Sequence, residues 1–247
     1  MLSLYLVPGE ALPDIGSSLR IDGDEAHHIA RVARHRIGEE ILVSDGEGSR
    51  ARATIVQIDR DSVQVRIEEK SHSNPATIRF RVIQALTKSD RAHECVDLLV
   101  AAGVDEIVPW SAERSIGKWD SASSYEKWLG WIRSAVKQTR RDRIPKLEPV
   151  QTDPSFAPSQ DELILAFDEN ADVRLDGKWA TSQLEGLASL RTISLVIGPE
   201  GGLSNREIER LESSGAYVVR LGTPILRSAH AGAIALSAVQ AALSIWH

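Results

Sequence analysis

The sequence feature that most constrains the fold is a buried apolar run that ends in a glycine-rich turn. Ile193–Ile197 is too short and too bounded for a helix and is typical of a buried strand in a parallel sheet. The segment Gly198–Gly202 follows at once, and its glycines allow backbone conformations that side chains block. Ser204 and Glu207 then have capping-box spacing, which predicts the start of a helix. Open α/β sheets bind ligands at this strand–loop–helix junction.

A second junction of the same kind lies near the end of the chain. A strand predicted at Ala216–Leu221 ends in the apolar loop Leu221–Arg227, and Ser228 is placed to cap a long helix over Ala229–Trp246. That helix is small and apolar on most faces, which predicts that it is buried or paired with another subunit. Lying beside the first loop, the second could bind a flat aromatic group, with Arg227 as its strong cation.

The two parts of the chain have different patterns. Residues 1–72 are strand-rich and predict a small β-barrel, a form often used to bind nucleic acid. A polar, turn-prone segment at 72–75 marks the predicted domain boundary, and residues 73–247 then alternate strands with helices. This alternation predicts an α/β domain with a mainly parallel sheet of about six strands. The predicted elements of the first part are strands Glu40–Ser44, Arg52–Ile58 and Ser62–Ile67 and helix Glu25–Arg34; those of the second are strands Ile78–Ala85, Glu106–Trp110 and Leu163–Phe167 and helices Asp90–Ala102 and Ser124–Gln138.

Composition excludes several classes of protein. The net charge of −6 over 247 residues argues against indiscriminate coating of nucleic acid. No apolar run approaches the length of a membrane span. The single cysteine, Cys95, cannot form an internal disulfide, which favours a cytoplasmic location, and its helical pattern predicts a packed thiol. The pair His27 and His28 has no further ligand at suitable spacing, so no metal site is expected.

Positive charge is nevertheless concentrated locally. The strongest block runs from Arg133 to Lys146, and within it Arg133, Lys137 and Arg140 have the spacing of one helix face. Such a block is equally consistent with phosphate contact and with a solvated helix end. The chain has no phosphate-binding G-x-x-x-x-G-K-[ST] or G-x-G-x-x-G motif and no G-x-S-x-G elbow. The residues alone therefore support a ligand-binding α/β enzyme, and they do not identify its substrate.

Several motifs together resemble those of one family. They are Ile197–Gly202 and Leu221–Arg227, His28-Ile29-x-Arg31-Val32-x-Arg34, Gly103-Val104 with Ile107-x-Pro109, Glu113-Arg114-Ser115, and Gln138 with Arg141, Arg143 and Pro145. In this order they resemble the SPOUT methyltransferases, in particular the bacterial small-subunit rRNA uridine-N3 methyltransferases. The resemblance implies a PUA-like β-barrel for RNA over residues 1–72. It also implies a SPOUT α/β domain over residues 73–247, with a deep trefoil knot, bound S-adenosylmethionine and a homodimer interface.

The resemblance also implies roles for particular residues. The substrate would be 16S rRNA or the assembled small subunit, with Arg227 stabilising charge on the uracil. His230 stands where this chain departs from the family pattern and is a candidate base near neutral pH. The implied cofactor-binding residues are Ala166, Phe167, Asp168, Ile197, Gly198, Pro199, Glu200, Gly201, Gly202, Leu221, Gly222, Pro224, Ile225, Leu226 and Ala231. The implied RNA-binding residues are His28, Arg31, Arg34, Arg114, Arg140, Arg141 and Arg143.

The chain departs from the family pattern around the expected active face. Ser228-Ala229-His230 stands where the family usually has Thr-Glu-Thr, so an acid is lost at Ala229. Family charges are also replaced at Pro224, Leu98, Ala101 and Lys137. Two alternatives stay open: a SPOUT methyltransferase acting on tRNA or 23S rRNA, and a catalytically idle RNA-binding assembly factor.

Overall fold

The computed structural model describes residues 2–153, 159–176, 178–179, 182 and 190–245. The chain forms two compact units, one of residues 1–75 with 133–144 and the other of 76–132 with 145–247. The predicted boundary at 72/73 lies near the first crossing between them. No pattern in the sequence indicates that residues 133–144 join the first unit, and the two-domain division of the chain stays a proposal.

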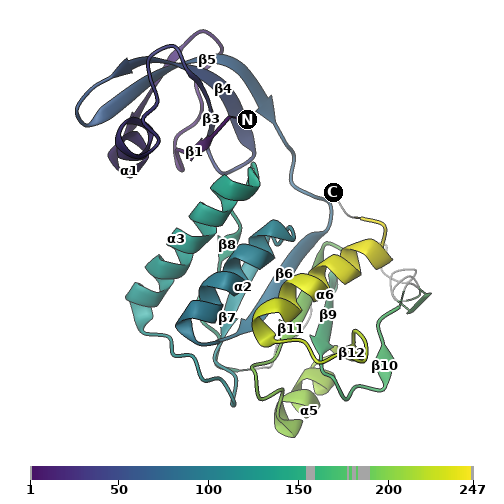
Figure 1. The fold of residues 1–247 in the computed structure, drawn as a ribbon. Coiled ribbons are helices and arrows are strands. Elements are labelled where there is room, and N and C mark those ends of the chain that lie inside the picture. Colours follow the sequence, from purple (N-terminus) through teal and green to yellow (C-terminus); the bar gives the residue numbers. More distant parts are fainter. Residues whose placement is uncertain (1, 154–158, 177, 180–181, 183–189, 246–247) are drawn as a thin grey trace. The chain divides into compact units, whose positions relative to one another are not determined.

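The first unit is built on a five-stranded sheet (Figure 1). Its order is β1-β3-β4-β5-β2, antiparallel except where β1 pairs with β3. Alternating apolar residues such as Val63, Val65 and Ile67 face a shared core and are fully buried. The strands are β1 (Leu4–Leu6), β2 (Ser18–Asp22), β3 (Glu40–Ser44), β4 (Ser49–Ile58) and β5 (Ser62–His72). The predicted strands are confirmed, and β1 and β2 were missed.

The helix predicted at Glu25–Arg34 is confirmed in part: the helical segment begins and ends two residues earlier, and it is not α-helical throughout. The chain instead forms a short α1 (Gly23–His27) and then a π-helix, η1 (His28–Val32). Ile29 is fully buried within this segment. The segment ends before Arg34, which adopts a positive φ of 56° that no helix continues through.

Residues 133–144 complete the first unit by packing on the β3–β4 turn. The amide of Gly48 donates to the Asp142 carbonyl at 3.0 Å, and that of Ile144 donates to the Gly46 carbonyl at 2.8 Å. A Cβ at Gly46 would lie 2.5 Å from the Ile144 side chain, so only glycine allows this approach. The hairpin predicted at Asp45-Gly46 is thus confirmed, and its glycine has a second, long-range role.

The second unit is built on a seven-stranded, fully parallel sheet in the order β10-β12-β9-β11-β6-β7-β8. Its strands are β6 (Arg79–Ala85), β7 (Glu106–Trp110), β8 (Lys146–Leu147), β9 (Glu162–Phe167), β10 (Val173–Arg174), β11 (Thr192–Ile197) and β12 (Tyr217–Arg220). Every residue of the central strand β11 is buried. The parallel α/β architecture is confirmed, while the trefoil knot stays a prediction.

Helices cover both faces of this sheet (Figure 1). Alternate residues of β6 show it: Val82 faces α6, whereas Ile83 joins a core that includes Leu211 of α5. The helices of this part are α2 (Ser89–Ala101), α3 (Ser121–Thr139), α5 (Asn205–Ser213) and α6 (Ser228–Ala242). α3 crosses into the first unit at residue 133. The predicted helix end at Trp246 lies outside the described residues, and α6 itself ends at Ala242.

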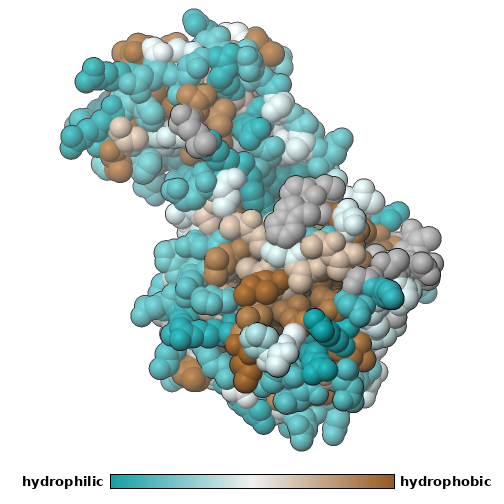
Figure 2. All heavy atoms as spheres, turned by 45° about the vertical axis from the view of Figure 1, so that its right-hand side comes forward, coloured by the Kyte–Doolittle hydropathy of each residue, from teal (hydrophilic) through white to brown (hydrophobic). Residues whose placement is uncertain are grey.

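The helices α2 and α6 pack side by side and leave apolar residues exposed. Leu98 in α2 and Ile234 in α6 both keep part of their surface in solvent. Figure 2 shows hydrophobic residues gathered on one face of this unit, with hydrophilic residues around them.

The close contact of α6 with β6 depends on Gly232. A Cβ at this position would lie 2.9 Å from Gln84 Oε1 and 3.0 Å from Leu99 Cδ2, both buried. We expect Gly232→Ala to lower the free energy of unfolding by about 1 kcal/mol, because overpacking outweighs the gain in helix propensity. The matched control is Gly130→Ala in α3, where a Cβ meets nothing within 4 Å. It should raise that free energy by about 0.5–1 kcal/mol. Urea unfolding of both variants measures this; stabilisation by Gly232→Ala would contradict the packing account.

Candidate active site

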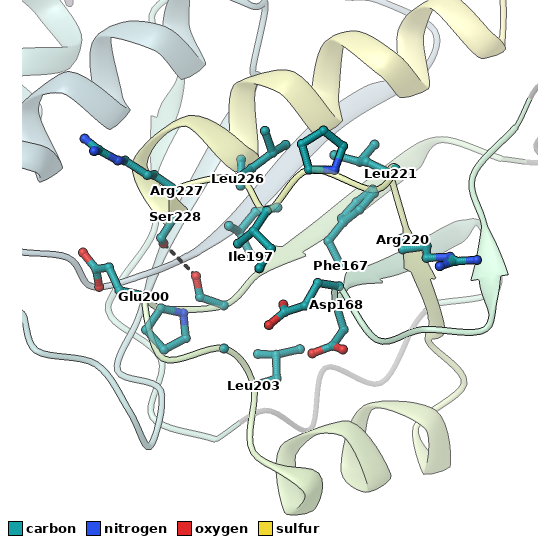
Figure 3. Close-up of a pocket in the computed structure, with 18 residues that line it drawn as sticks. Phe167, Asp168, Ile197, Glu200, Leu203, Arg220, Leu221, Leu226, Arg227 and Ser228 are labelled. Atoms are coloured by element: carbon teal, nitrogen blue, oxygen red, sulfur yellow. Dashed lines mark hydrogen bonds between the residues drawn. The ribbon is translucent and has the colours of Figure 1, made fainter.

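A cavity of about 250 Å³ lies at the edge of the sheet where β9, β11 and β12 end (Figure 3). Because parallel strands share one carboxyl edge, the loops that follow these three strands converge there. The first carries Asp168 and Glu169, the second Gly198–Leu203, and the third Leu221–Arg227. The two junctions predicted from the sequence therefore face one cavity, joined by the loop after β9.

The glycine-rich loop is tightly folded. Gly202 adopts a φ of +69°, and its amide donates to the Pro199 carbonyl at 2.9 Å to close a turn. A Cβ at Gly198 would lie 3.1 Å from the buried Leu203 side chain. The predicted capping box is present: Ser204 Oγ accepts from the Glu207 amide at 3.1 Å, and the Glu207 carboxylate accepts from the Ser204 amide at 2.8 Å. Hydrogen bonds within the loop and at the start of α5 thus define its shape.

The third loop is held to the second through Ser228. Its hydroxyl donates to the Gly198 carbonyl at 2.7 Å and lies 3.2 Å from Gln84 Nε2, which donates to it. The prediction that Ser228 caps α6 is therefore wrong, because Arg227 is the N-cap and no side chain caps this helix. Within the described part of the chain, the backbone groups of residues 221–226 make no hydrogen bond. They are left available to a ligand.

Charged groups are distributed around the apolar walls. The acidic residues Asp168, Glu169 and Glu200 line the cavity together with Arg220 and Arg227. Asp168 is buried, and its Oδ1 accepts from the Asn170 amide at 2.8 Å. Figure 3 shows Arg227 and Arg220 on opposite sides of the cavity. The arrangement suits a partly aromatic ligand that carries positive charge and hydroxyl groups.

Comparison with known proteins decides the family. A family model described as an RNA methyltransferase domain matches residues 74–240, and one described as an RNA methyltransferase PUA domain matches residues 21–68. The ribosomal RNA small subunit methyltransferase E of Mycobacterium tuberculosis is 35% identical over 242 residues, covering 96% of this chain and 91% of the relative. The chain belongs to the ribosomal RNA small subunit methyltransferase E family.

More distant relatives and solved structures agree. The Bacillus subtilis member is 26% identical over 226 residues, covering 89% of this chain and 88% of its own. The Neisseria gonorrhoeae member, solved bound to S-adenosylmethionine, has the same fold, with a TM-score of 0.86 at 24% identity over 98% of each chain. A Legionella pneumophila protein solved with bound S-adenosylmethionine gives a TM-score of 0.80 at 26% identity, again over 98% of each chain. The predicted PUA-like and α/β methyltransferase architecture is confirmed.

Most of the predicted cofactor residues line the cavity of this methyltransferase. Those that do are Phe167, Asp168, Ile197, Gly198, Pro199, Glu200, Gly202, Leu221, Gly222, Pro224, Ile225, Leu226 and Ala231. Ala166 is buried within β9, and Gly201 packs against Arg114 instead. The sequence interpretation missed Glu169, Leu203, Arg220 and Ser228. Each adjoins a predicted residue or motif, so extending every loop by one position would have found them.

The two predicted catalytic residues are in different places. Arg227 lines the cavity, whereas His230 does not. The ring of His230 turns toward α2, where its Nε2 lies 3.0 Å from Glu94 Oε1. The hydrogen bond with His230 holds the pKa of the Glu94 carboxyl below its usual value. His230 and Glu94 therefore form an exposed pair beside the cavity.

The predicted RNA-binding residues differ in their structural partners. On the PUA unit, His28, Arg31 and Arg34 are exposed, as RNA contact requires. Arg143 instead donates from Nη2 to the Ser73 carbonyl at 2.6 Å, which gives it a structural role. Arg140 and Arg141 are half-buried beside it.

The predicted helix face of basic residues in the block 133–146 is wrong in part. Helix α3 ends at Thr139, and Arg140 follows it with a φ of +54°, so Arg140 lies outside the helix. Lys137 forms an ion pair with Glu25, at 2.7 Å between Nζ and Oε1.

Arg114 holds the glycine-rich loop. Its Nη1 donates to the carbonyls of Gly201 and Leu203, at 2.9 and 3.1 Å. The adjacent amide of Glu113 donates to Glu207 Oε1 at 2.8 Å, on the capping box itself. The segment after β7 therefore supports the glycine-rich loop. The Glu-Arg-Ser motif is visible in the sequence, but its contact with this loop is not.

Cys95 is fully buried in α2, and burial raises the pKa of its thiol to about 12, so it is no nucleophile at neutral pH. Among the described residues no group of His, Cys, Asp and Glu side chains is arranged to hold a metal ion. No described helix has the length and apolar character needed to cross a membrane.

Proposed function

We propose that this chain transfers a methyl group from S-adenosylmethionine to N3 of a uridine in 16S rRNA, in the cytoplasm. The observation that carries the proposal is the cavity at the carboxyl ends of β9, β11 and β12, with Arg227 at its rim. Membership of a family whose relatives are named for small-subunit rRNA methylation supports the substrate. Either 16S rRNA or the assembled small subunit would be the partner.

The residues of the cavity fit S-adenosylmethionine. Phe167, Ile197 and Leu226 offer apolar walls to an adenine ring, whose edge can pair with the unused backbone groups of residues 221–226. The carboxylates of Asp168 and Glu200 suit ribose hydroxyls and the positive charges on sulfur and nitrogen. When bound, S-adenosylmethionine supplies an electrophilic methyl group.

The uracil needs two things from the protein. Its N3 carries a proton that must leave before or as the N3–methyl bond forms, and the base must be displaced from its stack to reach the cavity. Arg227 would stabilise the negative charge that develops on the uracil oxygens, because it is a strong cation lining the cavity. We retain His230 as the candidate base; its ring would have to leave Glu94 and turn toward the cavity.

Further contacts complete the proposal. The exposed His28, Arg31 and Arg34 of the PUA unit would bind RNA phosphates. A second copy of the chain would cover the apolar residues Leu98 and Ile234, which α2 and α6 leave exposed. Ala229, which stands where the family usually has an acid, is buried and does not line the cavity. The loss of this acid therefore leaves the cavity lining unchanged, which favours an active enzyme over an idle scaffold.

The function is tested by methyl transfer from labelled S-adenosylmethionine to small subunits from cells that lack this protein. We expect 3-methyluridine in 16S rRNA by nucleoside analysis, and no transfer to subunits from cells that contain the protein. A methylated nucleoside in tRNA or 23S rRNA instead would favour the related enzyme activity. Cofactor binding without any product would favour the idle assembly factor.

Arg227→Ala tests the charge-stabilising role. Loss of a preorganised group at the developing charge should lower kcat by about 100- to 1,000-fold, while the affinity for S-adenosylmethionine changes little. Arg220→Ala is the matched control, because Arg220 lines the same cavity on its other side. Single-turnover kinetics and calorimetry measure the two quantities. An equal loss of cofactor affinity would make the role of Arg227 structural.

Ser228→Ala tests the connection between the two loops. Removing the hydroxyl leaves the Gly198 carbonyl without this donor, so we expect the affinity for S-adenosylmethionine to fall about fivefold to tenfold. Ser237→Ala, later in the same helix, is the control and should bind as the wild type does. Unchanged affinity in Ser228→Ala would show that the loops keep their shape without this bond.

A further inference from the structure

A second cavity, of about 580 Å³, lies in the methyltransferase unit outside the site described above. Its walls come from residues 86–88 after β6, residues 116–118 and 120 after β7, and one face of α3, with Ala92 of α2. Because β6 pairs with β11 in parallel, this cavity is at the same carboxyl edge of the sheet as the cofactor cavity. Neighbouring strands are about 4.8 Å apart, so the two cavities are separated by only a few strand spacings.

The two cavities also share supporting residues. Gln84 donates to Ser228, which lines the cofactor cavity, and the chain reaches the second cavity two residues later at Leu86. Arg114 holds the glycine-rich loop, and Ile116 lines the second cavity two residues later. The same two segments therefore fix the position of one cavity relative to the other.

The second cavity is positively charged. Lys88, Lys118 and Lys127 line it from three different segments, against the single carboxylate of Asp120. Lys88 and Lys118 are exposed, and neither is paired with a carboxylate among the residues that the structure describes. On a chain of net charge −6, three lysines converging on one hollow indicate an anionic ligand.

The walls that carry these lysines are closely packed. A Cβ at Gly117 would lie 2.2 Å from the Thr87 carbonyl oxygen, so the segment bearing Lys118 lies directly on the segment bearing Lys88. Trp128 is buried below and makes an edge contact with Trp119, at 5.4 Å between ring centroids. The two lysines are thus brought together by the fold and not by the chance approach of long side chains.

The chemistry of the walls favours a phosphate over a stacked base. The ring of Trp131 is already stacked on His93 at 5.0 Å between centroids, and Lys127 Nζ lies 5.0 Å from the centre of the same ring. The cavity therefore offers ammonium groups and few open aromatic faces. Lysine ammonium groups bind phosphate as point charges without reading sequence.

We propose that this second cavity holds a phosphodiester of the RNA strand next to the nucleotide that enters the cofactor cavity. The proposal rests on the proposed function, since it assigns residues to the RNA substrate of the same enzyme. Lys88 and Lys118 anchor the backbone, and the shared supporting segments set the distance from the anchor to the methyl group.

The test compares Lys88→Ala, Lys118→Ala and the double variant with Lys146→Ala. Lys146 is the matched control because it starts β8 at the opposite, amino edge of the sheet. Small subunits from cells lacking this protein serve as substrate, and filter retention of labelled 16S rRNA measures binding without turnover. Each single variant should raise KM and Kd about tenfold and leave kcat less affected. The slope of log affinity against log salt should fall by about 0.7 for each lysine lost.

The outcomes separate this proposal from the proposed function. Lysine variants that bind RNA as Lys146→Ala does would overturn the second site, even if the wild type methylates normally. A fall in kcat and in cofactor affinity together would also overturn it, because the lysines would then support the fold. RNA binding that depends on both lysines without any methylation would refute the proposed function and leave the anchor standing. A wild type that binds no RNA would refute both.

Discussion

The parallel pairing of β11 with β9 on one side and β6 on the other is the constraint on which the site depends. All six residues of β11 are buried, so its register is fixed by packing on both faces. A parallel register aligns the carboxyl ends of neighbouring strands. The loops after β9, β11 and β12 then meet in one cavity, and the loops after β6 and β7 meet in the next. A slip of one residue in β11 would turn each of its side chains to the opposite face of the sheet.

The loops at this edge of the sheet are held by hydrogen bonds between segments that are far apart in the sequence. Ser228 ties the last loop to the glycine-rich loop, and Arg114 with Glu113 ties that loop to the segment after β7. Glu207 takes part twice, as the acid of the capping box and as the acceptor for the Glu113 amide. The shape of the proposed cofactor site thus depends on tertiary contacts, among them the close fit of Gly232 in α6 against β6.

The sequence predicted what is local and missed what is long-range. Apolar runs, glycine turns and the capping box at Ser204 each leave a mark within a few residues, so the strands, the loops and most of the cavity lining could be read directly. The family resemblance supplied the cofactor and the PUA unit. The carbonyls to which Ser228 and Arg143 donate lie far from them in sequence. The pairing of His230 with Glu94 and the return of residues 133–144 to the first unit also depend on contacts between distant parts of the chain. The spacing of Arg133, Lys137 and Arg140 predicted one helix face, but spacing does not show where a helix ends, and α3 ends at Thr139.

The distribution of charge over the methyltransferase unit follows from its two ligands. A sulfonium cofactor is positively charged and an RNA strand is a polyanion, so one surface cannot favour both. Carboxylates from Asp168, Glu169 and Glu200 gather in the cofactor cavity, while lysines gather two strands away at the same edge. Arg227, the cation proposed to act on the reacting base, lines the cofactor side. This separation lets a chain of net negative charge bind RNA locally, and it confines the RNA backbone to a path that leaves the acidic cavity to the cofactor.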